Sequence, residues 1–352
     1  MSLDRILSKI APLDESAMQA ARARQDQLTK PQGSLGRLEE LSVQIAGITA
    51  QPQPSIRQKV ITVMAGDHGV VAEGVSAYPQ EVTPQMVENF LQGGAAINVL
   101  ARHVGARVVV ADLGVAVDLK PHADLVIRKI GYGTQNIAQG PAMSRLQAEQ
   151  AILAGAEIVE AQIAKGLDVL ATGDMGIGNT TPSAAIAAAF SGRPAREIVG
   201  RGTGVDDRGL ARKIEVVEKA LQVNRPDKSD AIDVLAKVGG FEIGGLAGAI
   251  LAAVGERKPV VVDGFISTAA AMLAVQLAPA TRSYLIAAHS SMERGHHLML
   301  DWLQLAPLLD LHLRLGEGSG AALALPLLEA SCKILSEMAT FGQAGVSEKS
   351  ET

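Results

Sequence analysis

Six short apolar runs, rich in β-branched residues, recur along the chain, and segments with helical spacing of apolar residues lie between most of them. Each run ends in a loop of small and polar residues. Apolar strands that alternate with helices bury both faces of a parallel sheet. The pattern therefore predicts an α/β fold with a mostly parallel, Rossmann-like sheet flanked by helices. The expected strands are residues 60–64, 107–111, 167–171, 259–262, 283–287 and 311–315.

The loops after these runs carry Asp, His, Ser and Glu side chains among glycines. In open α/β sheets, ligands bind outside the carboxyl ends of the strands. Because these loops follow strands of one sheet, we expect them to converge on one edge and to form a single site there. The loops are residues 65–69, 112–114, 172–181, 263–268, 288–291 and 316–320.

The chain has 352 residues, of which 47% are hydrophobic, which is enough for one large domain and a smaller one. Residues 1–50 have helical spacing that is interrupted at residues 31–36, and the second helix places Leu41 and Ile45 on one face. Residues 51–54 predict a turn or linker. We therefore expect the large α/β domain to span residues 55–320.

The composition excludes several classes of protein. The net charge is −5 and aromatic residues make up 3%, so neither a basic stripe nor stacking aromatics indicate a nucleic-acid partner. The longest apolar stretches, such as residues 244–254, are too short to span a bilayer. Residues 1–12 lack the apolar region of a signal peptide. The single cysteine, Cys332, fits a buried helix face and a reducing compartment, so we expect a cytoplasmic protein.

The loop at residues 173–181 follows an expected strand and precedes an expected helix, for which Thr180 or Thr181 can be the N-cap. Its glycines let the backbone approach a ligand, and the amides at a helix N-terminus favour a phosphate. The loop is not a Walker A motif, because the lysine is missing. The alternative is a tight strand-to-helix turn without a ligand.

A second glycine-rich loop, residues 200–204, has no preceding strand and so does not match a dinucleotide-binding fingerprint. Its amides can form a nest for an anion, with Arg201 and Lys213 as nearby cations. A purely structural loop fits the same residues. The neighbouring Asp206 and Asp207 favour a solvated helix start over a metal site.

The histidines do not form a metal-binding pattern. His296 and His297 are consecutive and cannot share a helix face. His68 and His289 each follow an expected strand, so either can line the pocket, whereas His312 lies within an expected strand and is interpreted as packed or hydrogen-bonded. No group of residues has metal-ligand spacing, and we expect neither a metal nor another cofactor.

Glu317 is the strongest candidate for catalysis. It follows the expected strand at residues 311–315 and has a glycine on both sides, which leaves one face of its carboxylate open. A carboxylate partly desolvated at the sheet edge has a raised proton affinity, which suits a general base. The alternative is a helix N-terminal acid ahead of Ala321. Asp174 and Asp263 occupy similar loops, where each can orient a sugar hydroxyl or offset developing positive charge.

Six segments carry specific motifs, namely KPQGSLG at 30–36, GDHGV at 66–70, GVSAYP at 74–79, GIGNTT at 176–181, GRGTG at 200–204 and LGEGSG at 315–320. In this order they resemble the nicotinate-nucleotide–dimethylbenzimidazole phosphoribosyltransferase family over nearly the whole chain. The resemblance implies that nicotinate mononucleotide and 5,6-dimethylbenzimidazole are converted to α-ribazole 5′-phosphate and nicotinate, in assembly of the cobalamin nucleotide loop. It also implies a homodimer without a metal, and a small helical domain built from residues 1–50 and about 321–352.

The resemblance also implies roles for individual residues. The family's proton acceptor matches Glu317. Asp174 stands where the family usually has Glu and is one methylene shorter, so a direct contact made by Glu is lost or water-bridged, and a catalytic role for Asp174 is a secondary prediction. Implied to bind the benzimidazole are Ser76, Tyr78, Gln85 and Leu315, and implied to bind the phosphate and ribose are Gly176, Ile177, Gly178, Asn179, Thr180, Gly202, Thr203, Gly204, Val205, Lys213, Asp263, Gly264, Ser290 and Ser291.

The implied reaction is consistent with a single carboxylate base. The leaving nicotinate is a pyridinium, and its departure from C1′ neutralises a ring nitrogen without a general acid. The attacking benzimidazole becomes cationic, which acidifies the N–H that Glu317 accepts, and attack from the opposite face inverts C1′ from β to α. Two alternatives remain, namely a nucleotide N-glycosidic hydrolase in which Glu317 activates water, and a non-catalytic nucleotide-binding protein.

Overall fold

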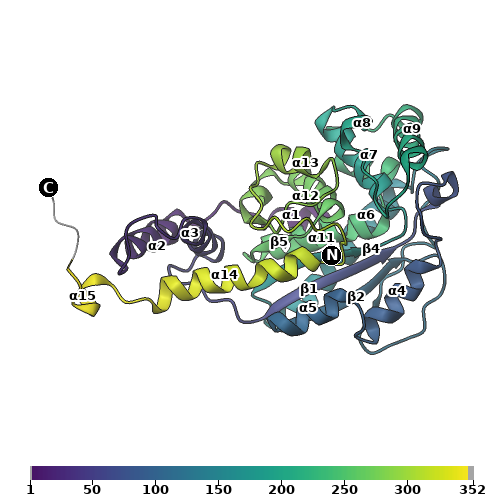
Figure 1. The fold of residues 1–352 in the computed structure, drawn as a ribbon. Helices are drawn as coiled ribbons and strands as arrows, with labels where there is room; N and C mark the ends of the chain where they lie inside the picture. Colours follow the sequence, from purple (N-terminus) through teal and green to yellow (C-terminus); the bar gives the residue numbers. More distant parts are fainter. Residues whose placement is uncertain (1, 348–352) are drawn as a thin grey trace.

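The computed structural model describes residues 2–347, and its centre is a six-stranded sheet in which all paired strands are parallel (Figure 1). Hydrogen-bonded neighbours follow the order β3-β2-β1-β4-β5-β6, so the chain starts in the middle of the sheet and winds outward in both directions. This is the strand order of doubly wound Rossmann-type sheets, and it confirms the predicted fold class. The strands are β1 (Lys59–Gly66), β2 (Ala106–Gly114), β3 (Leu125–Ile127), β4 (Val169–Met175), β5 (Val260–Val262) and β6 (Leu285–Ala287).

Helices lie against both faces of the sheet (Figure 1). One face is covered by α6 (Arg145–Ile163), α11 (Phe241–Gly255) and α12 (Phe265–Leu277), and the other by α4 (Val82–Leu91), α5 (Ala96–Val104) and the first half of α14 (Ser319–Glu337). Outside the first layer lie α7 (Thr180–Ser191), α9 (Asp207–Asn224) and α10 (Ala231–Val238). Shorter elements are η1 (Gly69–Glu73), α8 (Ala195–Ile198), η2 (Pro279–Tyr284), α13 (His296–Leu303) and α15 (Phe341–Ala344).

The apolar runs serve two cores at once, because side chains alternate between the faces of a strand. In β1, Val60 and Met64 pack in the core beneath α11, and Ile61 and Val63 pack in the core beneath α14. A strand that is buried on both faces has no side that faces water, which explains why the expected strands are predominantly apolar runs.

One expected strand is wrong. Residues 311–315 form an irregular segment in which Leu311 and Leu315 are 52% and 57% exposed, and His312 has φ +54°. The alternation of leucine with polar residues imitates an edge strand, but no strand of the sheet pairs with it. His312 is consequently exposed, not packed. The short strand β3 was not expected, because Leu125–Ile127 is too brief to form an apolar run.

The N-terminal helices are α1 (Leu3–Leu7), α2 (Glu15–Gln27) and α3 (Arg37–Thr49), with the predicted break between the last two. Figure 1 shows α2 and α3 beside the distal half of α14, extending away from the sheet. Ala21, Val43, Ala46 and Leu335 form a small core there, which we call the arm core. In contrast, α1 packs against α11 in the main body. The division into residues 1–50 with about 321–352, and 55–320, stays a prediction, and residues 348–352 lie outside the described residues.

Cys332 lies on the buried face of α14, as predicted. Its side chain is in the core that covers the second face of the sheet, and burial raises the pKa of its thiol to about 12. The thiolate is the reactive form of cysteine. Cys332 is therefore a packing residue.

Candidate active site

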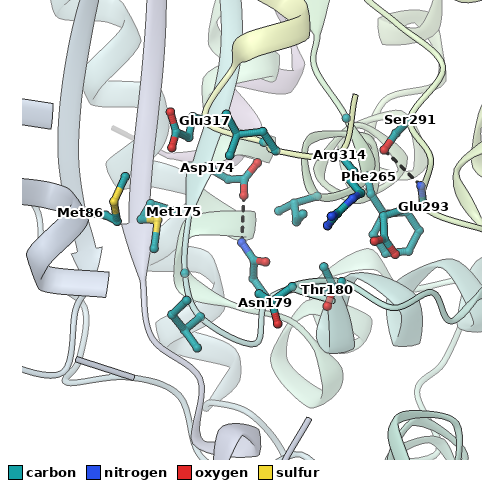
Figure 2. A pocket seen from close by; sticks show the side chains of 18 of the residues that line it. Met86, Asp174, Met175, Asn179, Thr180, Phe265, Ser291, Glu293, Arg314 and Glu317 are labelled. Atoms are coloured by element: carbon teal, nitrogen blue, oxygen red, sulfur yellow. Dashed lines mark hydrogen bonds between the residues drawn. The ribbon is translucent and has the colours of Figure 1, made fainter. Parts of the chain in front are cut away.

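A cavity of about 460 Å³ opens at the carboxyl edge of the sheet, beyond the ends of β4, β5 and β6. Of the loops expected there, those after β1 and β2 do not contribute to its lining. Other walls come from α4, from the loop at 200–204 and from the residues just before α14 (Figure 2). The lining residues are Tyr78, Val82, Met86, Asp174, Met175, Gly176, Ile177, Asn179, Thr180, Gly202, Thr203, Gly264, Phe265, Ile266, His289, Ser291, Glu293, Arg314, Leu315, Gly316 and Glu317.

The end of β4 and the start of α7 form the floor of the cavity. The N-cap of α7 is Asn179 and not the predicted Thr180 or Thr181, and the Asn179 side chain does not cap the helix. Instead, Asn179 Nδ2 donates to Asp174 Oδ2 at 2.9 Å. Gly176 packs so tightly that a Cβ there would lie 2.3 Å from the Gly66 carbonyl oxygen. The glycine therefore allows the turn between β4 and α7 to pack directly against the end of β1.

Asp174 is buried in this floor, where its charge is strongly disfavoured. Desolvation is the main cause that raises its pKa from 3.8 to about 8. The neighbouring carboxylates of Asp263, Glu242 and Glu317 contribute to this rise, and the hydrogen bond from Asn179 opposes it. At neutral pH the Asp174 carboxyl is therefore mostly protonated. A neutral acid at this position lessens the repulsion that a second carboxylate in the cavity would meet.

Glu317 lies on the wall next to Asp174, in an unusual backbone conformation. Gly316, Glu317 and Gly318 have φ values of +85°, +63° and +90° in succession. Positive φ is costly for a residue with a Cβ, and such strain gathers at functional sites. The loop is pressed against β4, since a Cβ on Gly173 would lie 2.4 Å from the Glu317 carbonyl oxygen. The glycines on both sides thus let the loop turn at the cavity wall.

Glu317 is 6% exposed as a whole residue and lines the cavity (Figure 2). Burial raises its pKa above the usual glutamate value, Asp263 raises it further, and a hydrogen bond lowers it. That bond comes from the Ile97 backbone N–H, which donates to Glu317 Oε2 at 3.2 Å. The bond leaves Oε1 available to accept a proton from a bound molecule.

Asp263 supports this loop from outside the cavity lining. Its Oδ2 accepts from the Gly318 N–H at 3.2 Å and its Oδ1 accepts from the Ala321 N–H at 2.8 Å. Burial raises the pKa of Asp263, and the charge of His289, whose Nε2 is 3.8 Å from Oδ1, lowers it. The carboxylate at the N-terminus of α14 is also favoured by the helix dipole. Asp263 therefore anchors the segment that carries Glu317.

Lys213 brings a cation close to the N-terminus of α7. Its Nζ donates to Thr180 Oγ1 at 2.8 Å, and a Cβ on Gly202 would lie 2.7 Å from the same nitrogen. Burial lowers the pKa of Lys213 to about 8, while the charge of Glu293 raises it. The glycine-rich loop at 200–204 and the α7 N-terminus thus converge with a buried lysine between them, an arrangement that suits an anion.

The cavity has an apolar side and a polar side. Figure 2 shows Met86 and Met175 on the side nearest Glu317, with Arg314 and Glu293 across from them. The apolar side suits a flat aromatic ring, because thioethers pack adaptably against aromatics. A molecule that spans both sides therefore needs an aromatic part and a polar or anionic part.

A family model described as phosphoribosyltransferase matches residues 10–346. The chain belongs to this phosphoribosyltransferase family. Proteins named nicotinate-nucleotide–dimethylbenzimidazole phosphoribosyltransferase from Roseiflexus sp. strain RS-1 and Chloroflexus aurantiacus strain J-10-fl are 62% and 61% identical to it, over 99% and 97% of this chain and 99% and 98% of their own. A crystal structure of the same name from Thermus thermophilus has a TM-score of 0.92 at 49% identity, and covers 96% of this chain and 100% of the other.

In this phosphoribosyltransferase, the cavity brings together many of the residues selected from the sequence. Their roles stay predictions. Those in the lining are Tyr78, Asp174, Gly176, Ile177, Asn179, Thr180, Gly202, Thr203, Gly264, Ser291, Leu315 and Glu317; those outside it are Ser76, Gln85, Gly178, Gly204, Val205, Lys213, Asp263 and Ser290. Ser76, Gly204 and Val205 instead line a neighbouring hollow with Arg208 and Arg212, and Thr203 Oγ1 connects the two by accepting from the Ala77 N–H at 3.0 Å.

Several lining residues of the phosphoribosyltransferase were missed. Met86 lies on a helix whose apolar spacing resembles that of any core-facing helix, and Arg314 lay in an expected strand. Glu293 belongs to a loop without a glycine-rich motif. Of the two loop histidines, His289 lines the cavity, whereas His68 Nε2 is 2.8 Å from Glu242 Oε1 beneath it. Asp206 accepts from the Gly209 N–H at 2.8 Å as the N-cap of α9, as predicted.

Metal ligands and membrane spans can be assessed only for residues 2–347. In that range no three or more His, Cys, Asp or Glu side chains are grouped so that they could hold a metal ion. No helix in the same range combines the length and apolarity needed to cross a membrane.

Proposed function

We propose that this phosphoribosyltransferase moves the 5-phosphoribosyl group from nicotinate mononucleotide to 5,6-dimethylbenzimidazole. The products are α-ribazole 5′-phosphate and nicotinate, and the reaction serves assembly of the cobalamin nucleotide loop. The observation that carries the proposal is a buried carboxylate, Glu317, in a cavity that has an apolar wall beside it and the N-terminus of α7 in its floor. The names of the relatives support the same substrates.

The nucleotide phosphate is proposed to bind at the N-terminus of α7. The Thr180 hydroxyl and the loop that holds Gly202 lie side by side in the cavity wall, and the dipole of α7 favours negative charge at its N-terminus. Lys213 lies directly behind Thr180, with its pKa lowered to about 8 by burial. A phosphate dianion would raise this pKa again and would retain the lysine charge. Arg314 at the exposed rim adds a second cation near the phosphoribosyl group.

The aromatic acceptor is proposed to bind between Met86, Met175 and Leu315, which form the apolar side near Glu317. Binding there would bring one ring nitrogen toward C1′ and the other toward the carboxylate. The main contribution of the site is then to hold two small molecules in line, which by itself lowers the barrier of a bimolecular reaction.

The chemistry needs one proton acceptor. The C1′–N bond to nicotinate breaks, its electron pair neutralises the pyridinium nitrogen, and a benzimidazole nitrogen forms the new bond to C1′ from the opposite face. Attack from that face inverts the configuration at C1′ from β to α. The second benzimidazole nitrogen then gives its proton to Glu317. Burial raises the pKa of Glu317, which brings its proton affinity closer to that of the group it must deprotonate.

The proposal is tested by measuring nicotinate release from nicotinate mononucleotide with and without 5,6-dimethylbenzimidazole. We expect release to depend on the base and to equal the α-ribazole 5′-phosphate formed. Release that ignores the base would identify an N-glycosidic hydrolase in which Glu317 activates water. Saturable binding of the nucleotide without any product would identify a non-catalytic binding protein.

We further propose that the chain is a homodimer that works in the cytoplasm. Large apolar side chains beside the cavity are exposed, including Leu311, Met292 and Leu315, and such patches are typical of interaction surfaces. The lone thiol of Cys332 is compatible with a reducing compartment. Sedimentation equilibrium of the purified chain tests the dimer, for which we expect about twice the chain mass of 36.6 kDa.

A further inference from the structure

His296, the first residue of α13, is fully buried directly behind the polar side of the cavity. Both of its ring nitrogens have hydrogen-bond partners. The Ser291 backbone N–H donates to His296 Nδ1 at 3.0 Å, and His296 Nε2 lies 2.9 Å from Thr268 Oγ1. A buried imidazole with two partners of this kind has a defined protonation state.

The backbone partner fixes the direction of every bond in this series. An amide N–H can only donate, so His296 Nδ1 has no proton and Nε2 carries it. The Nε2–H therefore donates to Thr268 Oγ1, and the Thr268 hydroxyl proton donates to the Gly264 carbonyl oxygen at 2.7 Å. Burial, with a smaller contribution from the nearby His289 and His297, lowers the pKa of His296 to about 3, so the ring stays neutral.

The two ends of this series are both in the cavity wall. Ser291 and Gly264 line the cavity from the loops after β6 and β5, respectively. Ser291 Oγ in turn accepts from the Glu293 N–H at 3.3 Å, and the His296 N–H donates to the Glu293 carbonyl oxygen at 3.0 Å. Figure 2 shows Ser291 and Glu293 joined in this way, away from Met86 and Met175. His296 thus stabilises the turn at residues 291–296, which lies on the polar side of the cavity, and none of these hydrogen bonds involves the apolar side.

We propose that His296 is a positioning residue for the phosphoribosyl half of the site. As the neutral Nε2–H imidazole, it holds the Ser291 turn at a fixed distance from the Gly264 turn, and it thereby sets the affinity for nicotinate mononucleotide. The aromatic acceptor binds on the other side of the cavity and does not depend on it. The inference rests on the proposed function. It deepens that function because it assigns the positioning of the nucleotide site to residues that do not position the site of the aromatic acceptor.

Thr268→Val tests the series because it removes the hydroxyl that accepts from His296 and keeps the shape of the side chain. Loss of one neutral hydrogen bond predicts that KM for nicotinate mononucleotide rises about threefold to tenfold. KM for 5,6-dimethylbenzimidazole and kcat should stay within about twofold of the wild type. Thr268→Ser retains the hydroxyl, and its KM for nicotinate mononucleotide should lie between those of the wild type and Thr268→Val. Rescue by serine would distinguish the hydrogen bond from the packing of the threonine.

Thr281→Val is the matched control. Thr281 is also fully buried, but within the described part of the chain its hydroxyl has no hydrogen-bond partner and it does not line the cavity. This variant should leave both KM values unchanged. A Thr268→Val protein with wild-type nucleotide KM overturns the inference, and so does one in which the KM values for both substrates rise together with a lower Tm. Absence of product from the wild type would contradict the proposed function instead.

A second measurement is independent of activity. In the ¹⁵N spectrum of histidine-labelled protein, His296 should show an unprotonated Nδ1 and a protonated Nε2 across neutral pH, with His296→Asn providing the assignment. A protonated Nδ1, or a ring that gains a proton near neutral pH, overturns the inference whatever the kinetics show.

Discussion

The two walls of the cavity that carry Asp174 and Glu317 are held in place differently. Asp174 is part of β4, whose backbone pairs with β1 as far as Met175, so the register of the sheet places it. Glu317 belongs to an irregular segment that individual hydrogen bonds hold in place. The Ile97 N–H donates to the Glu317 side chain, and the Asp263 carboxylate accepts from the N–H of the next residue, Gly318. The position of Asp174 is therefore robust, whereas the position of Glu317 depends on a few atoms.

The two carboxyl groups also differ in charge. Burial raises the pKa of Asp174 to about 8, which leaves it neutral at pH 7. The Ile97 N–H offsets part of the corresponding rise in the pKa of Glu317. The better-placed acid is thus the neutral one, and the acid on the irregular wall is the better proton acceptor. The comparison predicts that changes to the Glu317 wall reduce turnover more than changes to Asp174.

The largest effect is expected for Glu317→Gln, which keeps the size of the side chain and removes the proton acceptor. We expect kcat to fall on the order of 10²- to 10⁴-fold, because that is the usual contribution of a general base. Nucleotide binding and Tm should change little. Single-turnover assays and calorimetry measure the two quantities, with the exposed Glu81→Gln as control. Near-normal turnover in the folded variant would show that Glu317 is not the base.

A smaller loss is expected for Gly173→Ala, at the point where the two walls touch. The new Cβ would lie 2.4 Å from the Glu317 carbonyl oxygen, so the loop must shift. We expect about a tenfold to hundredfold lower kcat, and unfolding that is easier by about 1–3 kcal/mol, as is usual for overpacking. Gly140→Ala is the control, because nothing lies within 4 Å of its Cβ position. Unchanged kcat would show that the loop tolerates displacement.

Asp174→Asn should lower kcat by less than tenfold, which is the order of effect of a lost neutral hydrogen bond. It should also stabilise the protein at alkaline pH. The raised pKa of about 8 means that the wild type gains stability below the unfolded value of 3.8 and loses it as pH rises toward 8. The variant should therefore become more stable than the wild type between these values, by on the order of 2–5 kcal/mol at pH 8. Denaturant titrations at pH 5 and pH 8 measure the difference in the free energy of unfolding between the variant and the wild type. An equal difference at the two pH values would contradict the prediction.

The smallest effect concerns the acid limb of the wild-type pH profile. Because burial raises the pKa of Glu317, the carboxylate gains its proton at a higher pH than an exposed glutamate. Log kcat should therefore fall with unit slope as pH decreases through a value above 4.5, the usual glutamate pKa. The limb should be absent from the residual activity of Glu317→Gln. A limb that persists there would belong to another group.

The two walls also differ in how well the sequence predicted them. The strand and the glycine-rich loop around Asp174 are local patterns, since each apolar run and its turn are contiguous in the chain, and they were confirmed. The wall of Glu317 was assigned to a strand at residues 311–315 that does not exist. Its true supports, Ile97 and Asp263, are 220 and 55 residues distant from the groups they contact. No local pattern encodes such contacts.

The same reason explains which cavity residues were missed. Met86 reaches the cavity from the face of α4, and Glu293 and Arg314 come from irregular segments. Their side chains meet only because the layers of the fold bring them together. The substrate contact expected for Asp263 stays a prediction. What the sequence did not indicate is that its carboxylate accepts from two backbone amides at the N-terminus of α14, which is a common use of an acid at a helix N-terminus.

The length of α14 has a mechanical consequence. The helix begins at Ser319, two residues after Glu317, and Leu335 near its other end packs in the arm core (Figure 1). Its 19 residues make a rod about 28 Å long. Pro326 removes one helix hydrogen bond and is the softest point of the rod. The arm core and the Glu317 loop are thus attached to opposite ends of one helix, so that any displacement of the arm would act on the loop without a contact inside the cavity.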